Sequence, residues 1–246
     1  IVGPALAPLF VLPFVGLPGP LFAFALIAVV VYAAIQIGLP EDRGGPGRGR
    51  GAAMSYPSLA SMITGASVRA ATAPARQKRL SWRDSRIRRW IVAGVIAGHA
   101  QAATLTCIGF FIIDTLKLEP LGSEGPIAIV MMAGAGGTLA AQWGLIPKLD
   151  LSPRALIVWG SLISAAGLAI TAFATDLYGL VLGFGLASIG FGFTRPGFTA
   201  GASLAVPLAE QGGVAGVITS ANGISYIAAP TVGMAMYALD PHLPFG

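Results

Sequence analysis

The chain has 246 residues, of which 55% are hydrophobic and 10% are charged, and its mean hydropathy is +0.78. Soluble domains carry about 25% charged residues, so this composition excludes an ordinary soluble enzyme and indicates a membrane protein. The formal net charge is +5, and because the cations are concentrated in one stretch of the chain, anionic lipid headgroups are the expected partner of that charge.

Seven apolar segments are candidates for helices that cross the bilayer, which takes about 20 residues each. The first, residues 1–16, is short and interrupted by Pro4, Pro8 and Pro13. We expect it to be the remainder of a longer helix in a fragment that is cut at both ends. The other helices are expected at residues 20–38, 87–113, 126–144, 155–174, 177–198 and 214–239. The predicted fold is therefore an all-α polytopic membrane protein with about seven transmembrane helices, the first incomplete.

The second and third of these segments are separated by a long basic loop. Of the 15 Lys and Arg residues, 11 lie between Arg43 and Arg89. Charged side chains cost on the order of 3 kcal/mol each at the bilayer centre, and cationic loops stay in the cytoplasm. With this loop in the cytoplasm, 14 of the 15 cations lie on or near that side and only Lys117 lies outside. We therefore expect a multi-pass protein of the cytoplasmic (inner) membrane, with its basic loop on the cytoplasmic side.

Two features of the basic loop allow more than one interpretation. Residues 43–51 resemble an Arg-Gly tract that binds RNA, but few aromatic residues are nearby for base stacking, so we expect no nucleic-acid partner. Residues 58–71 carry apolar side chains at helical spacing. They fit a weak amphipathic helix on the membrane surface and a solvated loop equally well.

Two similar short elements occur near the ends of the chain. Gly3-Pro4-Ala5-Leu6-Ala7 lies in the first apolar segment, and Ala229-Pro230-Thr231-Val232-Gly233 lies in the last. Each has a small residue, a proline, two spacers and another small residue. Similar helices on either side of a basic loop indicate two halves related by an internal repeat.

With these elements in place, the chain resembles the major facilitator superfamily, in particular its drug:proton antiporters of the tetracycline-exporter type. Such exporters carry Gly-Pro-x-x-Gly on helix 5 and a weaker echo on helix 11. Here Ala7 and Ala229 replace two of those glycines. Residues 210–216 resemble the loop into helix 11, and residues 142–154 are similar in position and charge to the loop between helices 8 and 9.

The resemblance covers nearly the whole chain and maps it to helices 5 to 11. It implies three parts: the end of the N-terminal bundle at residues 1–38, the cytoplasmic loop at 39–86, and a C-terminal bundle without its last helix at 87–246. In the family, the carboxylates that couple protons often lie in helices 1 and 4. The fragment is therefore not expected to transport alone.

Polar side chains inside the predicted spans are candidates for a transport pathway, because burial costs free energy unless they pair or bind. His99, Gln101 and Thr104 lie midway along the 87–113 segment, which corresponds to helix 7, a cavity-lining helix of the family. An imidazole suits proton binding and release near neutral pH. The alternative for His99 is a neutral ring bonded to a backbone carbonyl or a neighbouring helix.

Arg195 is the only cation well inside the 177–198 segment, which corresponds to helix 10. Three roles are open for it: it anchors an anionic substrate group, it pairs with an acid as a gate, or its side chain snorkels to the membrane interface. Asn222 contacts substrate or forms a hydrogen bond between helices. Prolines bend helices and small residues allow close packing, so we expect a conformational and packing role for Gly3, Pro4, Pro230 and Gly233. The residues Gly179, Gly183, Ala187 and Gly190 are expected to pack closely against another helix.

Enzyme signatures are missing from the sequence. It has no His-Glu-x-x-His, no Gly-x-Ser-x-Gly and no Cys/His cluster, and Cys107 is its single cysteine. We expect no enzyme, no cofactor and no metal. The predicted function is secondary active transport, with proton-coupled export of small, mildly lipophilic compounds by a protein that is monomeric when full length. The alternatives are an uptake symporter for an organic acid or sugar, which Arg195 would favour as an anion anchor, and a non-transporting membrane protein or membrane enzyme.

Overall fold

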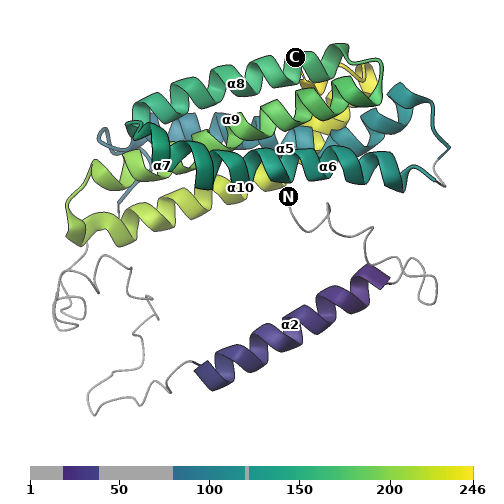
Figure 1. The fold of residues 1–246 in the computed structure, drawn as a ribbon. Coiled ribbons are helices and arrows are strands. Elements are labelled where there is room, and N and C mark those ends of the chain that lie inside the picture. Colours follow the sequence, from purple (N-terminus) through teal and green to yellow (C-terminus); the bar gives the residue numbers. More distant parts are fainter. Residues whose placement is uncertain (1–18, 39–79, 120–121, 246) are drawn as a thin grey trace.

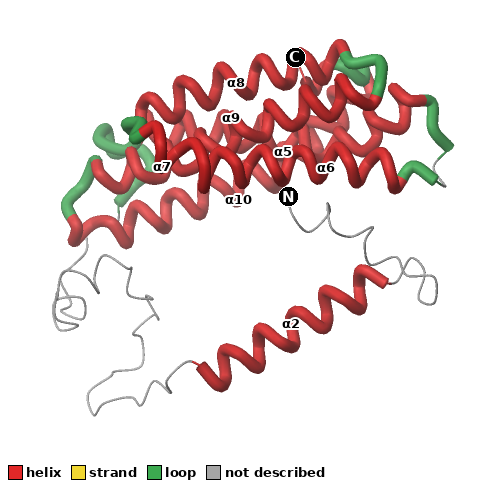
Figure 2. The backbone as a smooth tube through the Cα atoms, in the orientation of Figure 1, coloured by secondary structure: helices red, strands yellow, loops and turns green. Residues whose placement is uncertain are grey.

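The structure is a computed structural model that describes residues 19–38, 80–119 and 122–245. Every regular element in these residues is a helix (Figures 1 and 2). The bundle contains α5 (Arg88–Leu116), α6 (Glu124–Leu139), α7 (Ile146–Leu149), α8 (Pro153–Phe173), α9 (Leu177–Leu204) and α10 (Gln211–Leu239). The remaining elements are α2 (Gly19–Gly38), the π-helical turn η2 (Ala140–Leu145), and the 3₁₀ turns η3 (Leu208–Glu210) and η4 (Leu243–Phe245).

The long helices of the bundle, α5, α6, α8, α9 and α10, run alongside one another and alternate in direction (Figure 1). Among the described residues, four segments are long and apolar enough to cross a membrane: Arg88–Leu116, Glu124–Leu149, Pro153–Phe173 and Leu177–Leu204. The 29-residue helix α10 packs along α5. The predicted all-α, polytopic fold is confirmed. The predicted helix at 1–16, with Gly3 and Pro4, and most of the basic loop lie outside the described residues.

The structure corrects three helix boundaries. Lys148 was expected in a loop, but the helix that starts at Glu124 continues through η2 and α7 to Leu149. The helix expected to end near Phe198 continues to Leu204, because Phe198 and Ala202 pack in the apolar core against α5 and α10. The helix expected at residues 87–113 continues to Leu116, and Asp114 in its last turn accepts a hydrogen bond from Tyr237.

Helix α9 is the centre of the bundle and packs against α5, α6 and α8. Small residues on both helices bring α9 close to α8. A Cβ atom on Gly183 would lie 2.5 Å from Thr171 Oγ1, and one on Gly190 would lie 2.3 Å from Ser164 Oγ. Side chains at these two positions would therefore separate the helices, and the predicted packing role of Gly183 and Gly190 is confirmed.

The apolar core of the described bundle has two main parts, one toward each end. One contains Cys107, Phe111, Val130, Leu180 and Phe184, together with neighbouring residues. The other contains Ile87, Ile91, Phe198, Val214 and Ile218, together with their neighbours. Between these two levels, α5 and α10 carry amide side chains, and this level contains the candidate site.

Candidate functional site

A small hollow lies where α5, α9 and α10 meet. It is lined by Ala97, Gly98, Gln101, Thr194, Arg195, Phe198, Asn222 and Tyr226. Three of the five residues expected in a transport pathway, Gln101, Arg195 and Asn222, are therefore on one hollow, although they come from three helices far apart in sequence.

The three residues also lie at a similar depth. Counted from the same end of the bundle at 1.5 Å per residue, Arg195 is roughly 14 Å along α9, Asn222 roughly 16 Å along α10 and Gln101 roughly 20 Å along α5. Helices of this length extend roughly 42 Å, whereas the hydrocarbon core of a bilayer is about 30 Å thick. The hollow therefore lies within the depth that the hydrocarbon core would occupy.

The hollow is open on one side. Thr194 and Phe198 are buried, Gln101 and Asn222 are half-buried, and Arg195 and Tyr226 are exposed. Its free volume is about 10 Å³, which is close to the space that one water molecule needs. The hollow is thus a shallow recess with a polar floor, and Arg195 and Tyr226 form its exposed edge.

The polar groups of this recess have unused hydrogen-bonding capacity. Within the described part of the chain, the side chains of Gln101, Arg195 and Asn222 form no hydrogen bond and no ion pair. The Thr194 hydroxyl is satisfied, because it donates to the Phe191 carbonyl oxygen at 3.2 Å. Polar side chains at membrane depth are costly unless a partner binds them. The recess can therefore offer donors and a positive charge to a bound molecule.

His99 and Thr104 lie outside this recess. The Thr104 side chain is fully buried, and its hydroxyl donates to the Ala100 carbonyl oxygen at 2.8 Å. His99 is half-buried, and its Nδ1 lies 2.9 Å from the Val95 carbonyl oxygen. A carbonyl oxygen only accepts, so the proton of the neutral ring is on Nδ1, and Nε2 remains able to take up a proton.

The recess contains residues that the sequence did not single out. Tyr226 follows Asn222 by four positions and therefore shares its helix face, a spacing that could have identified it. Gly98 provides space, because a Cβ atom there would lie 2.9 Å from Ser225 Oγ. Thr194 and Phe198 carry no sequence signal that would place them here.

Pro230 and Gly233, the packing motif of α10, follow the recess residues Asn222 and Tyr226 along the helix. Pro230 is within α10 and does not end it, and Gly233 is buried. A Cβ atom on Gly233 would lie 3.1 Å from Ala103 Cβ and 3.3 Å from Cys107 Sγ. The small residue thus allows α10 to lie directly against α5.

Polar contacts also join α5 and α10 at both ends. Arg86, just before α5, donates to Asp84 at 2.8 Å and to Glu210, just before α10, at 2.7 Å. These two hydrogen bonds raise the pKa of Arg86 above its ordinary range, so the guanidinium stays charged. At the opposite end, the Tyr237 hydroxyl donates to the Asp114 carboxylate at 2.5 Å.

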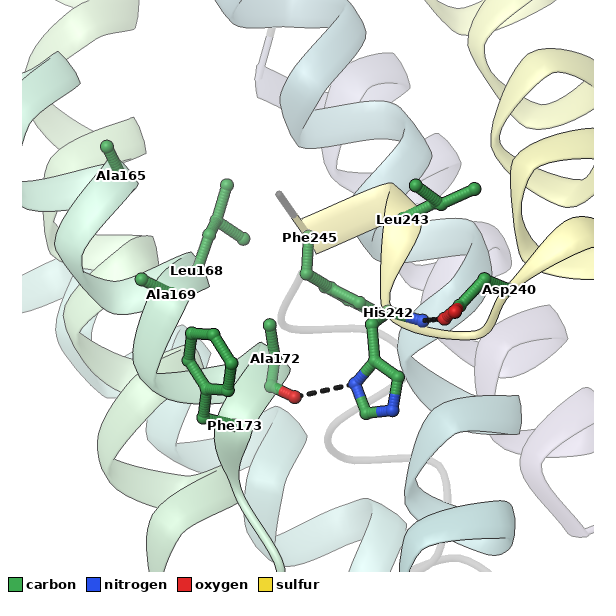
Figure 3. A pocket seen from close by; sticks show the side chains of 9 residues that line it. All are labelled: Ala165, Leu168, Ala169, Ala172, Phe173, Asp240, His242, Leu243 and Phe245. Carbon is green, nitrogen blue, oxygen red and sulfur yellow. Dashed lines mark hydrogen bonds between the residues drawn. The ribbon is translucent and has the colours of Figure 1, made fainter.

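A larger hollow of about 410 Å³ lies beside the end of α8 (Figure 3). Its wall is mostly apolar and is formed by Ala165, Leu168, Ala169, Ala172, Phe173, Asp240, His242, Leu243 and Phe245. The polar groups here are paired: His242 Nδ1 lies 2.7 Å from the Ala172 carbonyl oxygen, and Asp240 accepts from the His242 backbone N–H at 2.8 Å. Because of this pairing, it fits the site of a polar ligand less well than the recess does.

Comparison with known proteins identifies a family. The family model described as Major Facilitator Superfamily matches residues 1–230. No curated protein matches the chain.

Among the described residues, no group of three His, Cys, Asp or Glu side chains is placed to hold a metal ion.

Proposed function

Since the chain belongs to the major facilitator superfamily, we propose that it is the helix 5 to 11 portion of a proton-coupled exporter of small, mildly lipophilic compounds. Membership supports a multi-pass secondary transporter rather than an enzyme, with the bilayer and a small-molecule substrate as partners. The export direction, the proton as coupling ion and a monomeric state are part of the proposal. The resemblance of residues 229–233 to the helix 11 element of exporters supports the export direction.

The observation that carries the proposal is the recess of Gln101, Arg195 and Asn222 between two apolar parts of the core. In the superfamily fold, helices 7 and 10 line a central cavity, and they correspond to α5 and α9. Substrate sites in transporters lie near the middle of the membrane, between the moving halves. We assign the three unpaired polar side chains to substrate contact, with Arg195 and Tyr226 facing the cavity.

The charges at the helix ends support a cytoplasmic placement of the end where α5 begins. The cations at this end are Arg83, Arg86, Arg88, Arg89, Lys148 and Arg154, whereas Lys117 is the only cation of the described residues at the opposite end. Cation-rich ends face the cytoplasm. We therefore propose that the protein lies in the cytoplasmic (inner) membrane and that its basic loop faces the cytoplasm.

His99 is our candidate for a group that takes up a proton. The hydrogen bond from its Nδ1 to Val95 holds the ring in one orientation and leaves Nε2 free to accept. Its position outside the recess separates proton binding from substrate contact. Coupling would then require that proton binding at His99 and substrate binding in the recess favour the same conformation of the bundle.

Flux measurements on the full-length protein in proteoliposomes test this proposal. With an imposed pH gradient, Gln101→Ala and Asn222→Ala should each reduce saturable substrate flux by roughly 10-fold, the loss expected for one or two hydrogen bonds. Gln142→Ala is the matched control, because Gln142 is exposed and outside the recess. His99→Ala should reduce proton-driven flux by roughly 10-fold and spare exchange without a gradient. Unchanged flux in both amide variants would contradict the assignment.

An uptake symporter is the second candidate, and the unpaired guanidinium of Arg195 favours it. The same vesicles distinguish the two directions. If the protein concentrates substrate on the side toward which protons flow, it is a symporter. If substrate moves against the proton flow, it is an exporter.

A further inference from the structure

We propose that the recess binds an anionic head group, so that the transported compounds are organic anions with an apolar body. This inference rests on the proposed function and adds the substrate class. It assigns Arg195 as the anion anchor and Gln101 and Asn222 as neutral donors beside it.

The charge balance around the recess is the first support. Arg195 is a lining residue, and no described acid lies near its level in the helices that form the recess. At 1.5 Å per residue, Asp114 is roughly 20 Å along α5 from Gln101, and Glu210 is roughly 18 Å along the chain from Asn222. Both acids are also engaged elsewhere, with Tyr237 and Arg86. Within the described bundle, the guanidinium therefore has no carboxylate to neutralise it.

The donor chemistry is the second support. A guanidinium presents a planar fork of N–H groups that matches the oxygens of a carboxylate, sulfonate or phosphate, and such charge-assisted bonds are stronger than neutral ones. The amides of Gln101 and Asn222 each add an NH₂ group, and the Tyr226 hydroxyl adds another donor. None of these side chains forms a hydrogen bond within the described chain. An oxyanion would satisfy several of them together, whereas an organic cation would be repelled.

The shape of the recess is the third support. A free volume of about 10 Å³ is close to the space that one water molecule needs, so the recess accommodates one oxygen atom of a head group and no aromatic or aliphatic body. The body must therefore remain outside the recess, at the edge where Tyr226 is 44% exposed. The ring of Tyr226 offers an apolar face at the edge of the recess. The site is thus suited to an amphiphilic anion that places a head-group oxygen in the recess and leaves its body outside.

Three probes that share one body test the proposal on the full-length protein in detergent. The probes are naphthalene-1-sulfonate, the neutral naphthalene-1-sulfonamide and the cationic 1-naphthylmethylammonium, and their binding is measured by equilibrium dialysis. The sulfonate should bind roughly 10-fold or more tightly than the sulfonamide, as expected for charge-assisted hydrogen bonds. The ammonium compound should bind most weakly.

Substitutions then assign the preference to Arg195. Arg195→Gln should remove the preference for sulfonate and leave sulfonamide binding unchanged, which also shows that the variant is folded. Arg195→Lys should keep part of the preference, because it keeps the charge. Arg154→Gln is the control, since Arg154 is an exposed cation in the first turn of α8 and outside the recess.

The outcomes separate this inference from the proposed function. Equal binding of sulfonate and sulfonamide, no binding of either, or a preference that survives Arg195→Gln would overturn the anion site. If Arg195→Gln bound none of the probes, Arg195→Lys would decide the question. A preference for sulfonate in Arg195→Lys would support the anion site, and no preference would overturn it. A clear anion preference without proton-driven flux would instead overturn the proton-coupled function and leave the site in place.

Discussion

Replacing Gly167 by alanine should destabilise the bundle, because the added methyl group has nowhere to go. Its Cβ atom would lie 2.2 Å from the Ala187 backbone nitrogen and 2.7 Å from the Gly183 carbonyl oxygen. Both atoms are part of the α9 backbone and cannot rotate away. Ordinary contacts between heavy atoms are about 3.5 Å, so α8 and α9 would have to separate locally by roughly 1 Å.

The cost follows from two opposing terms. Overpacking of a close interface costs about 1–3 kcal/mol, whereas alanine is favoured over glycine in a helix by about 1 kcal/mol. A clash with backbone places the first term at its upper end, and the separation also loosens the neighbouring contacts of Gly183 and Gly190. We therefore expect a net loss of about 2 kcal/mol, or roughly 4–8 °C in the midpoint of thermal unfolding.

Cys107 provides the assay. It is the single cysteine of the chain and is fully buried, so a thiol-specific fluorogenic dye added to the protein in detergent reacts as the bundle unfolds. Gly136→Ala is the matched control, because a Cβ atom at Gly136 of α6 would have no neighbour within 4 Å. Its midpoint should stay unchanged or rise. If Gly167→Ala unfolded at or above the wild-type temperature, the close contact between α8 and α9 would be refuted.

Three further predictions use the same unfolding assay. Ser188 is buried and its hydroxyl has no hydrogen-bond partner among the described residues, so Ser188→Ala should keep or raise stability, by up to about 1 kcal/mol; a clear loss would show that the hydroxyl does form a hydrogen bond. Glu210→Gln weakens the contact with Arg86 and should lower the midpoint at low salt but not at about 1 M, where the Debye length is about 3 Å; an effect that does not change with salt would point to packing. Tyr237→Phe removes the hydrogen bond to Asp114 and should cost about 1 kcal/mol, with no cost expected when Asp114 is already replaced by alanine.

The sequence predicted the helices of the bundle but not where each one ends. Long apolar runs between charged or proline-containing segments identify a membrane helix because the bilayer excludes charge over a fixed thickness. A helix can continue beyond that thickness where side chains find partners. Helix α9 continues past Phe198 because Ala202 and Val206 still pack in the core, and α5 includes Asp114 because Tyr237 of α10 binds it. Both partners come from contacts that a single helix pattern does not contain.

The same distinction holds for the candidate site. Residue type alone selected Gln101, Arg195 and Asn222, since polar groups inside apolar helices are costly to keep. Their convergence depends on how α5, α9 and α10 are rotated about their axes, which is set by the small residues at the contacts. The rotation of α5 that brings Gly98 against Ser225 brings Gln101 to the recess and leaves His99 outside it. Position along the helix was predictable, whereas the direction of each side chain was not.

The contacts around the recess indicate which of its parts could respond to a substrate. Helices α5 and α10 are joined by polar contacts at both ends and lie directly against each other at Gly98 and Gly233. Pulling them apart would break all of these contacts together, so the floor formed by Gln101 and Asn222 should move as one body with the bundle. Arg195 and Tyr226 are at the exposed edge, and their side chains form no hydrogen bond or ion pair with the described part of the chain. Substrate selection in this half of the transporter should therefore be altered most readily at these two side chains, whereas changes in the floor should affect every substrate alike.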